Sequence, residues 1–210
     1  MKRRLRILIT AGPTREPIDP VRFLSNASSG AQGVAIAEAC LSRGWPVDFV
    51  HGPMEVTPPP GVALHPVTTT QEMLDECLRL HAPCDVVIGA AAVCDFRPQA
   101  LCENKQNRGE SSWTVELQPT EDILACLGKR KEQRVHVGFA LESQDLETNS
   151  ARKLDEKNLD WIVGNDPQAI GADSATYLIL GNDGSREELG RLSKPELAEH
   201  LCNLIDERLS

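Results

Sequence analysis

The sequence predicts an α/β fold, a Rossmann-like, doubly wound and mostly parallel sheet. Apolar strand-like runs alternate regularly with helical patterns along the chain, as is typical of sheets whose strands are joined by helices. The run CDVVIGAAAV, residues 84–93, is nearly all apolar, as expected of a strand covered on both faces. We expect one domain over residues 1–210, with a small antiparallel hairpin at about 174–192 and a flexible active-site lid at about 95–112.

The first half of the chain is predicted to contribute two further strands and two helices. The strands are the apolar runs at residues 5–11 and 45–53. The first helix, residues 30–44, is rich in small residues and ends at a glycine, a common helix stop. The second, residues 68–81, begins with threonine caps and an acidic first turn. The proline-rich run at 58–67 is predicted to be a loop or an extended link.

The second half begins with a polar stretch at 94–112 that is too long and too charged for a routine connection. Loops of this kind in compact domains are often functional lids. The hairpin is predicted to turn at Asn182-Asp183-Gly184, and the last helix to begin after a Ser193 cap. The remaining predicted elements are strands at 113–118, 134–141 and 159–166 and helices at 120–131, 145–158 and 193–209.

Composition excludes several classes of protein. Aromatic residues make up 4% of the chain and the net charge is −9, which argues against a surface that stacks bases or neutralises a nucleic-acid backbone. No 18-residue apolar run is present, so no membrane span is expected. Seven scattered cysteines without a CxxC pair favour reduced core thiols over disulfides or a zinc site. We therefore expect a cytoplasmic protein that binds neither nucleic acid nor membrane.

The segment SNASSGAQG, residues 25–33, has the chemistry of a phosphate-binding loop. It lies between a strand and a helix, so the unpaired N–H groups of the helix start would face a ligand. Ser28 and Ser29 add hydroxyl donors, and Gly30 and Gly33 would let a ligand approach the backbone. The GxGxxG fingerprint of dinucleotide-binding proteins is absent. The alternative is that these small residues only allow close packing of the helix on the sheet.

Two other stretches carry ionisable groups. Asp95 and Lys105 follow the strand at 84–93, whose carboxyl end should open into the crevice where such folds bind ligands. Lys153 and Lys157 are spaced i and i+4 on one helix face. The alternative for all four residues is a solvated surface position, and Phe139 by itself would be a core residue.

Taken in order, the segments LITAGPTREPIDPVRFLSNASSGAQG, VIGAAAVCDFRP with a downstream lysine, EDIL, VGFALES, ARKLDEKNLD and IVGND resemble one family over essentially the whole chain. That family is the phosphopantothenate–cysteine ligase (phosphopantothenoylcysteine synthetase) family of coenzyme A biosynthesis. The resemblance implies a Rossmann-like dimer that activates 4′-phosphopantothenate with CTP or ATP and Mg²⁺. Cysteine then displaces the nucleotide from the acyl-nucleotide intermediate.

The resemblance also assigns roles to individual residues. Asn26 matches the family asparagine that serves the acyl-intermediate step, Arg22 lies in the same motif, and Lys105 matches the lysine that supports acyl-nucleotide formation. These three are predicted to be catalytic. No direct protein ligand to the metal is predicted. The predicted nucleotide-binding residues are Ser28, Ser29, Gly30, Gly89, Ala90, Ala91, Asp95, Glu121, Asp122, Ile123, Leu124, Phe139, Lys153 and Lys157.

The sequence departs from the family pattern at three places. The lid reads Lys105-Gln106-Asn107-Arg108 in place of a Lys-x-Lys-Lys cluster, Thr120-Glu121 replaces Asn-Pro, and Ala31 stands where relatives often have lysine. Two alternatives therefore stay open: an NAD(P)-dependent oxidoreductase, and a divergent nucleotide-binding homologue without activity. A fused flavin-dependent decarboxylase domain is not expected, so decarboxylation would need a separate protein.

Overall fold

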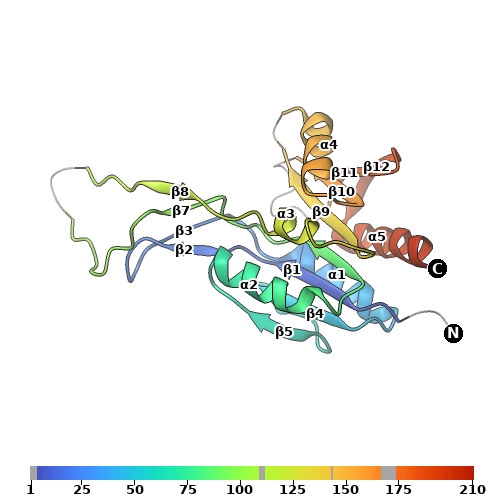
Figure 1. The fold of residues 1–210 in the computed structure, drawn as a ribbon, viewed down its shortest axis with the longest axis horizontal. Coiled ribbons are helices and arrows are strands. Elements are labelled where there is room, and N and C mark those ends of the chain that lie inside the picture. The colour runs from blue at the N-terminus through green and yellow to red at the C-terminus, as the bar shows by residue number, and fades with distance from the viewer. Residues whose placement is uncertain (1–3, 109–111, 143, 167–173) are drawn as a thin grey trace.

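A computed structural model describes residues 4–108, 112–142, 144–166 and 174–210, and its centre is one eight-stranded sheet (Figure 1). The six strands from β5 to β10 in the spatial order are mutually parallel, and β11 and β12 close one edge as an antiparallel hairpin. The predicted fold class is thereby confirmed. In spatial order the strands are β12 (Arg186–Ser193), β11 (Ser174–Gly181), β10 (Trp161–Asn165), β9 (Val135–Leu141), β6 (Val86–Gly89), β1 (Ile7–Ala11), β4 (Val47–His51) and β5 (Ala63–Pro66).

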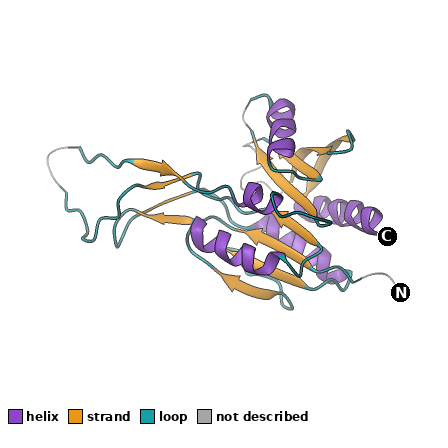
Figure 2. Ribbon diagram, in the orientation of Figure 1, coloured by secondary structure: helices purple, strands orange, loops and turns teal. Residues whose placement is uncertain are grey.

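Helices cover both faces of the sheet (Figure 2). α1 (Ala31–Ser42) and α5 (Lys194–Leu209) pack together on one face, while α2 (Thr70–His81), α3 (Ile123–Gly128) and α4 (Leu146–Glu156) lie on the other. Alternate residues of the central strand β1 serve the two faces. Ile7 and Ile9 belong to the core under α1 and α5, whereas Leu8 packs with Met73 and Leu74 of α2. This double burial explains why the strands read as continuous apolar runs.

The strand order places a topological switch point between β1 and β6. The chain winds outward from β1 through β4 to β5 on one side, and then from β6 through β9 to β10 on the other. The helices that follow β1 and β6 therefore leave toward opposite faces, which opens a crevice at the carboxyl ends of these two strands.

Two short antiparallel ribbons project from the sheet (Figure 1). One pairs β2 (Arg15–Pro17) with β3 (Phe23–Ser25), and the other pairs β7 (Phe96–Pro98) with β8 (Leu117–Pro119). We call the described residues 15–25, 96–108 and 112–119 the arm. The β2–β3 ribbon was not expected from the sequence, and residues 96–98 form a strand within the segment expected to be the lid loop.

Three further expectations need correction. The run at 58–67, expected to be a link, contains β5, an edge strand whose residues are mostly exposed and so lack an apolar pattern. The strand expected at 113–118 is Leu117–Pro119 and pairs with β7 outside the central sheet. The helix expected at 120–131 is only α3, because Asp122 is extended and caps it by accepting a hydrogen bond from Ala125 N at 3.0 Å.

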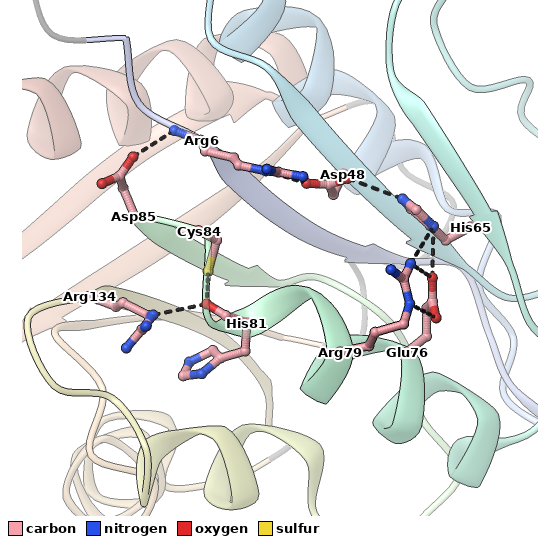
Figure 3. A network of polar contacts seen from close by, with 9 residues as sticks. All are labelled: Arg6, Asp48, His65, Glu76, Arg79, His81, Cys84, Asp85 and Arg134. Atoms are coloured by element: carbon pink, nitrogen blue, oxygen red, sulfur yellow. Dashed lines mark hydrogen bonds and ion pairs between the residues drawn. The ribbon is translucent and has the colours of Figure 1, made fainter.

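A polar network joins the strands on the α2 side of the sheet (Figure 3). The Asp48 carboxylate of β4 accepts a hydrogen bond from Arg6 Nε at 2.8 Å and lies 3.1 Å from Nε2 of His65 on β5. His65 Nδ1 lies 2.7 Å from Oε1 of Glu76 on α2. The network thus fixes the exposed edge strand to its neighbour and to the helix above it.

The cysteines agree with the expectation of reduced thiols. All seven are free, and Cys40, Cys77, Cys84, Cys94 and Cys202 are buried. Burial raises the pKa of the Cys77 thiol to about 12. Across the described ranges, no helix is long and apolar enough to cross a membrane.

Candidate functional site

A cavity of about 560 Å³ lies at the carboxyl edge of the sheet, over the switch point between β1 and β6. Thr10 of β1, Phe139 of β9 and Asn165 of β10 form its floor, and α1, α3 and α4 supply its walls. Its volume lies within the range of pockets that hold a nucleotide-sized ligand.

The first wall is the start of α1. Residues 26–32 line the cavity, and the helix cap, Gly30, has φ +82°. In the described part of the chain, the cap residue Gly30 offers no side-chain acceptor, and Ala31 N donates to Ser29 Oγ at 3.4 Å. The helix start therefore offers its other first-turn N–H donors and its positive partial charge to the cavity. Gly30 is required because of its left-handed backbone and because a Cβ there would lie 2.6 Å from Met54 Sδ.

Gly33 has a packing role. A Cβ on Gly33 would lie 2.5 Å from Cβ of Ala11 on β1, and Gly33 is buried outside the cavity lining. Each of the two interpretations of the SNASSGAQG segment thus applies to one of its glycines. Gly30 borders the cavity, as a ligand-binding loop requires, whereas Gly33 lets the helix approach the sheet.

The second wall follows β6, where the chain from Gly89 to Val93 runs beside the extension of β1. Ala90 N donates to Thr10 O at 3.1 Å, and Ala92 N donates to Gly12 O at 2.9 Å. Asn26 Nδ2 in turn donates to the carbonyl oxygens of Ala92 and Val93, at 3.2 and 2.8 Å. These bonds hold the Asn26 side chain at the carboxyl end of β6.

The third wall is formed by the start of α3 and the end of α4. Lys157 Nζ lies 2.9 Å from Asp122 Oδ2, and Lys153 Nζ lies 2.6 Å from Glu142 Oε1. Gly89 allows α3 to approach the sheet, because a Cβ there would lie 2.7 Å from Cδ1 of Leu124. Lys153 and Lys157 therefore line the cavity paired with carboxylates, and an anionic ligand would compete with these carboxylates for the lysines.

The side chains of the cavity fit a metal ion that is bound mainly by the nucleotide and not by the protein. Asp95, Glu121 and Asp122 are the acidic lining residues, and no group of three His, Cys, Asp or Glu side chains in the described part of the chain could hold a metal ion. Mg²⁺ in nucleotide sites is bound chiefly by phosphate oxygens and water, so a nucleotide-borne Mg²⁺ fits these residues.

Fifteen of the seventeen predicted site residues line this one cavity. They come from five separate segments of the sequence, and the fold alone brings these segments together. The fifteen are Asn26, Ser28, Ser29, Gly30, Gly89, Ala90, Ala91, Asp95, Glu121, Asp122, Ile123, Leu124, Phe139, Lys153 and Lys157.

The other two, Arg22 and Lys105, lie on the arm outside the cavity lining. Lys105 is exposed. Arg22 follows the turn of the β2–β3 ribbon, where its guanidinium lies 2.5 Å from Oδ2 of Asp19 and donates to Gln106 O at 2.9 Å. Arg22 thus fastens the loop that carries Lys105 to the first ribbon, and the catalytic roles of both residues stay predictions.

Asp19 is the anchor of this contact. Burial alone would raise the pKa of its carboxyl group, but the backbone N–H groups of Val21, Arg22 and Gln106 and the Arg22 guanidinium hold the pKa below its ordinary value. The Arg22 guanidinium also lies 5.4 Å from the ring centroid of Trp113.

Several lining residues were not expected from the sequence, among them Thr10, Gln32, Asn165, Tyr177 and Lys194. Thr10 and Asn165 end strands, and polar residues at strand ends are a recognisable signal in this class of fold. Tyr177 and Lys194 come from the hairpin and α5, and nothing in their local sequence indicates the cavity.

A second hollow, of about 630 Å³, lies between α4 and the β11–β12 hairpin. Three of its charged side chains pair with one another: Arg186 lies 3.0 Å from Glu147 and 2.5 Å from Glu188. It borders β11 and β12 and not the switch point, and it shares only Tyr177 with the cavity over β1 and β6, so that cavity is the candidate site.

Strand order, two-sided helix cover and a cavity at the switch point define a doubly wound α/β protein with the binding site of that class. A family model, the DNA/pantothenate metabolism flavoprotein C-terminal domain, matches residues 2–209. The chain belongs to this family.

Relatives with names agree with this membership. The chain is 42% identical over 204 residues to the coenzyme A biosynthesis bifunctional protein CoaBC of Bacillus subtilis, covering 95% of this chain and 50% of the relative. It is 40% identical over 208 residues to the CoaBC protein of Haemophilus influenzae, covering 97% and 52%. The chain thus spans about half the length of these curated relatives.

Solved structures share the fold. The crystal structure of the C-terminal domain of CoaBC is 40% identical, with a TM-score of 0.85 and coverage of 98% of this chain and 95% of that one. A Cab2 variant in complex with phosphopantothenate-cysteine is 20% identical, with a TM-score of 0.80 and coverage of 99% and 88%. At that identity the likeness concerns the fold alone.

Proposed function

We propose that this chain is a phosphopantothenate–cysteine ligase that joins 4′-phosphopantothenate to L-cysteine with a nucleoside triphosphate. The observation that carries the proposal is the gathering of fifteen predicted site residues around one cavity at the switch point. Membership of the family and 42% identity to a coenzyme A biosynthesis protein support it. The missing GxGxxG fingerprint speaks against a dinucleotide-dependent oxidoreductase.

In the first step a carboxylate oxygen of phosphopantothenate attacks the α-phosphorus, the bond to the β-phosphate breaks, and pyrophosphate leaves. Negative charge accumulates at the α-phosphate during this step. The start of α1 and the lysines of α4 are fixed donors around the cavity. Such donors stabilise developing charge without reorganising, and removing one costs about 10²–10³-fold in rate.

In the second step the amine nitrogen of cysteine attacks the acyl carbon and loses a proton, while the acyl–oxygen bond breaks and the nucleoside monophosphate leaves. Asn26, held to the carbonyls of Ala92 and Val93, has the rigid support that a group beside the acyl intermediate needs. We assign it the task of orienting this intermediate.

The nucleotide is CTP or ATP, accompanied by Mg²⁺ that the phosphates and water bind. When bound, the ion neutralises phosphate charge. The lining around Ala90, Ala91 and Phe139 faces the base in this proposal, and backbone groups there select it.

A second copy of the chain is the proposed partner of the arm. Of the eight exposed large apolar side chains in the described ranges, six lie on the arm: Val21, Phe23, Phe96, Leu101, Trp113 and Leu117. Apolar groups concentrated on a projecting element are typical of an interface. Because Lys105 lies on the same arm and outside its own cavity, we propose that the arm delivers it to the cavity of the partner copy.

The test is a panel of CTP, ATP, GTP and UTP with phosphopantothenate, cysteine and Mg²⁺, measured by pyrophosphate release and by mass spectrometry of the product. We expect pyrophosphate release that requires phosphopantothenate and a product that requires cysteine. Lys105→Ala and Asn26→Ala should each lower the rate by about 10²-fold or more. Lys129→Met, an exposed position outside the cavity, serves as the control.

Two outcomes would reject the proposal. Binding of a nucleotide without turnover on any acid would assign the chain to the non-catalytic homologues. Binding of NAD(P) in preference to nucleoside triphosphates would favour the oxidoreductase.

A further inference from the structure

Two helices begin side by side at the cavity. Gln32 Nε2 at the start of α1 donates to the carbonyl oxygen of Lys194 at the start of α5, at 3.4 Å. Further along the same pair, Cys40 Sγ lies 3.7 Å from Cys202 Sγ. Both contacts join residues 162 positions apart, so the helices run parallel, with their N-termini at the same edge of the sheet.

The strand before α5 explains this arrangement. β12 is antiparallel to β11, which is antiparallel to β10, so β12 runs in the direction of the parallel strands. Its last residue, Ser193, caps α5 and therefore lies at the carboxyl edge. The next residue, Lys194, lines the cavity.

The positive charges of the cavity are unevenly distributed. The first turn of α1, from Ala31 to Val34, holds no charged side chain. Lys153 and Lys157 belong to the opposite wall, where Glu142 and Asp122 pair with them. Among the lining residues that the structure describes, Lys194 is the cation connected to the α1 wall.

We propose that Lys194 binds a terminal phosphate oxygen of the nucleotide, beside the Ser28–Gln32 segment. This assignment rests on the proposed function and adds a residue to it. α1 supplies N–H donors but no cation, so α5 provides the charge from a neighbouring helix. The Gln32 bond to the Lys194 carbonyl makes Gln32 a positioning residue that sets the distance between the two helix starts.

The position proposed for Lys194 determines which nucleotides should depend on it for binding. A lysine at the terminal phosphates adds a charge-assisted contact that a nucleoside monophosphate does not reach. Loss of Lys194 should therefore weaken triphosphate binding and spare monophosphate binding. A merely structural role would weaken both alike.

The experiment measures, by calorimetry with Mg²⁺, binding of the triphosphate that wild-type protein uses and of the matching monophosphate. Lys194→Met is compared with Lys194→Arg and with the exposed control Lys129→Met. We expect Lys194→Met to weaken triphosphate binding about 10–100-fold, with monophosphate binding unchanged. Lys194→Arg should restore most of the affinity, and Lys129→Met should match wild type.

Failure of this inference is distinguishable from failure of the proposed function. If wild-type protein binds the triphosphate and turns over, but Lys194→Met has wild-type triphosphate affinity or loses both ligands equally, the assignment of Lys194 is wrong. If wild-type protein binds no nucleoside triphosphate, the proposed function fails first, and the assignment of Lys194 falls with it.

Discussion

The ammonium nitrogen of Lys157, at the end of α4, lies 2.9 Å from Oδ2 of Asp122, the capping residue of α3. The side chains are 22% and 46% exposed, and exposed ion pairs of this kind contribute only about 0–1 kcal/mol to stability. Both residues line the cavity, on the wall that α3 and α4 form. We therefore predict that the pair contacts the ligand and adds little to stability.

Replacing Lys157 separates these two roles. Lys157→Met should weaken nucleotide binding about 10-fold and change the free energy of unfolding by less than about 1 kcal/mol. Calorimetric titration and urea unfolding measure the two quantities. Arg152→Met is a matched control, because Arg152 pairs with Glu156 at 2.7 Å on the same helix, outside the cavity lining. Equal nucleotide affinity in both variants would show that Lys157 is only a surface residue.

Sharing of the arm between two copies predicts complementation. Lys105→Ala and Asn26→Ala should each be inactive alone, whereas a refolded mixture should recover about a quarter of the wild-type rate, since about half of the dimers are hybrid and each has one intact site. Pyrophosphate release and sedimentation measure activity and mass. A dimer whose mixture stays inactive would mean that each arm serves its own cavity.

Acid should destabilise the protein through a buried histidine pair. His81 Nε2 lies 3.1 Å from His136 Nε2, and among the residues that the structure describes Nδ1 of His136 has no hydrogen-bond partner. Burial, together with the nearby His81, Lys131 and Arg134, lowers the pKa of His136 to about 3, and burial also lowers the pKa of His81. Arg134 donates to the His81 carbonyl oxygen (Figure 3), and Asp160 accepts from His136 N.

The sign follows from proton counting. Above pH 6.5 His136 is neutral in both states. Below that pH His136 binds a proton in the unfolded chain, whereas in the folded chain it stays neutral down to about pH 3. The free energy of unfolding therefore falls by about 1.4 kcal/mol per pH unit. Urea unfolding at pH 7.5 and 5.0 should show this loss, and His136→Leu should reduce it. Lys129→Met, at an exposed position, should leave it unchanged. An identical loss in His136→Leu would contradict the prediction.

The packing role assigned to Gly33 predicts a local loss of stability. Gly33→Ala would place a methyl group 2.5 Å from the Ala11 Cβ, a contact that should cost about 1–3 kcal/mol. Gly190→Ala is the control, because among the described residues, its two chain neighbours aside, no atom lies within 4 Å of the added Cβ. Thermal unfolding of both variants measures the difference. A Gly33→Ala protein as stable as wild type would show that α1 can retreat from the sheet at no cost.

Much of the candidate site could be predicted from sequence because local segments carry its chemistry. The SNASSGAQG loop, the apolar run ending at Gly89 and the Lys153–Lys157 pair each have a recognisable pattern, and all of them border the cavity. Lys194 could not be predicted in this way. It follows an antiparallel hairpin, and only the direction of β12 brings it to the same edge as α1.

The arm shows that a recognisable motif does not reveal where its residues lie in the fold. Arg22 and Lys105 belong to clear motifs, yet both lie on the arm and outside the cavity lining. Strands of three residues, such as β2 and β7, are too short to produce a periodic pattern, so sequence alone shows a polar loop.

The order of apolar runs and helices determined the doubly wound sheet, since burial on both faces requires each central strand to be a continuous apolar run. The tertiary structure decided which of the two glycines of the α1 loop meets the cavity and which meets the sheet. It also decided that Lys194 lines the same cavity as Lys153 and Lys157. Backbone direction and side-chain contact depend on partners distant in the chain, and a local pattern records only its own neighbours.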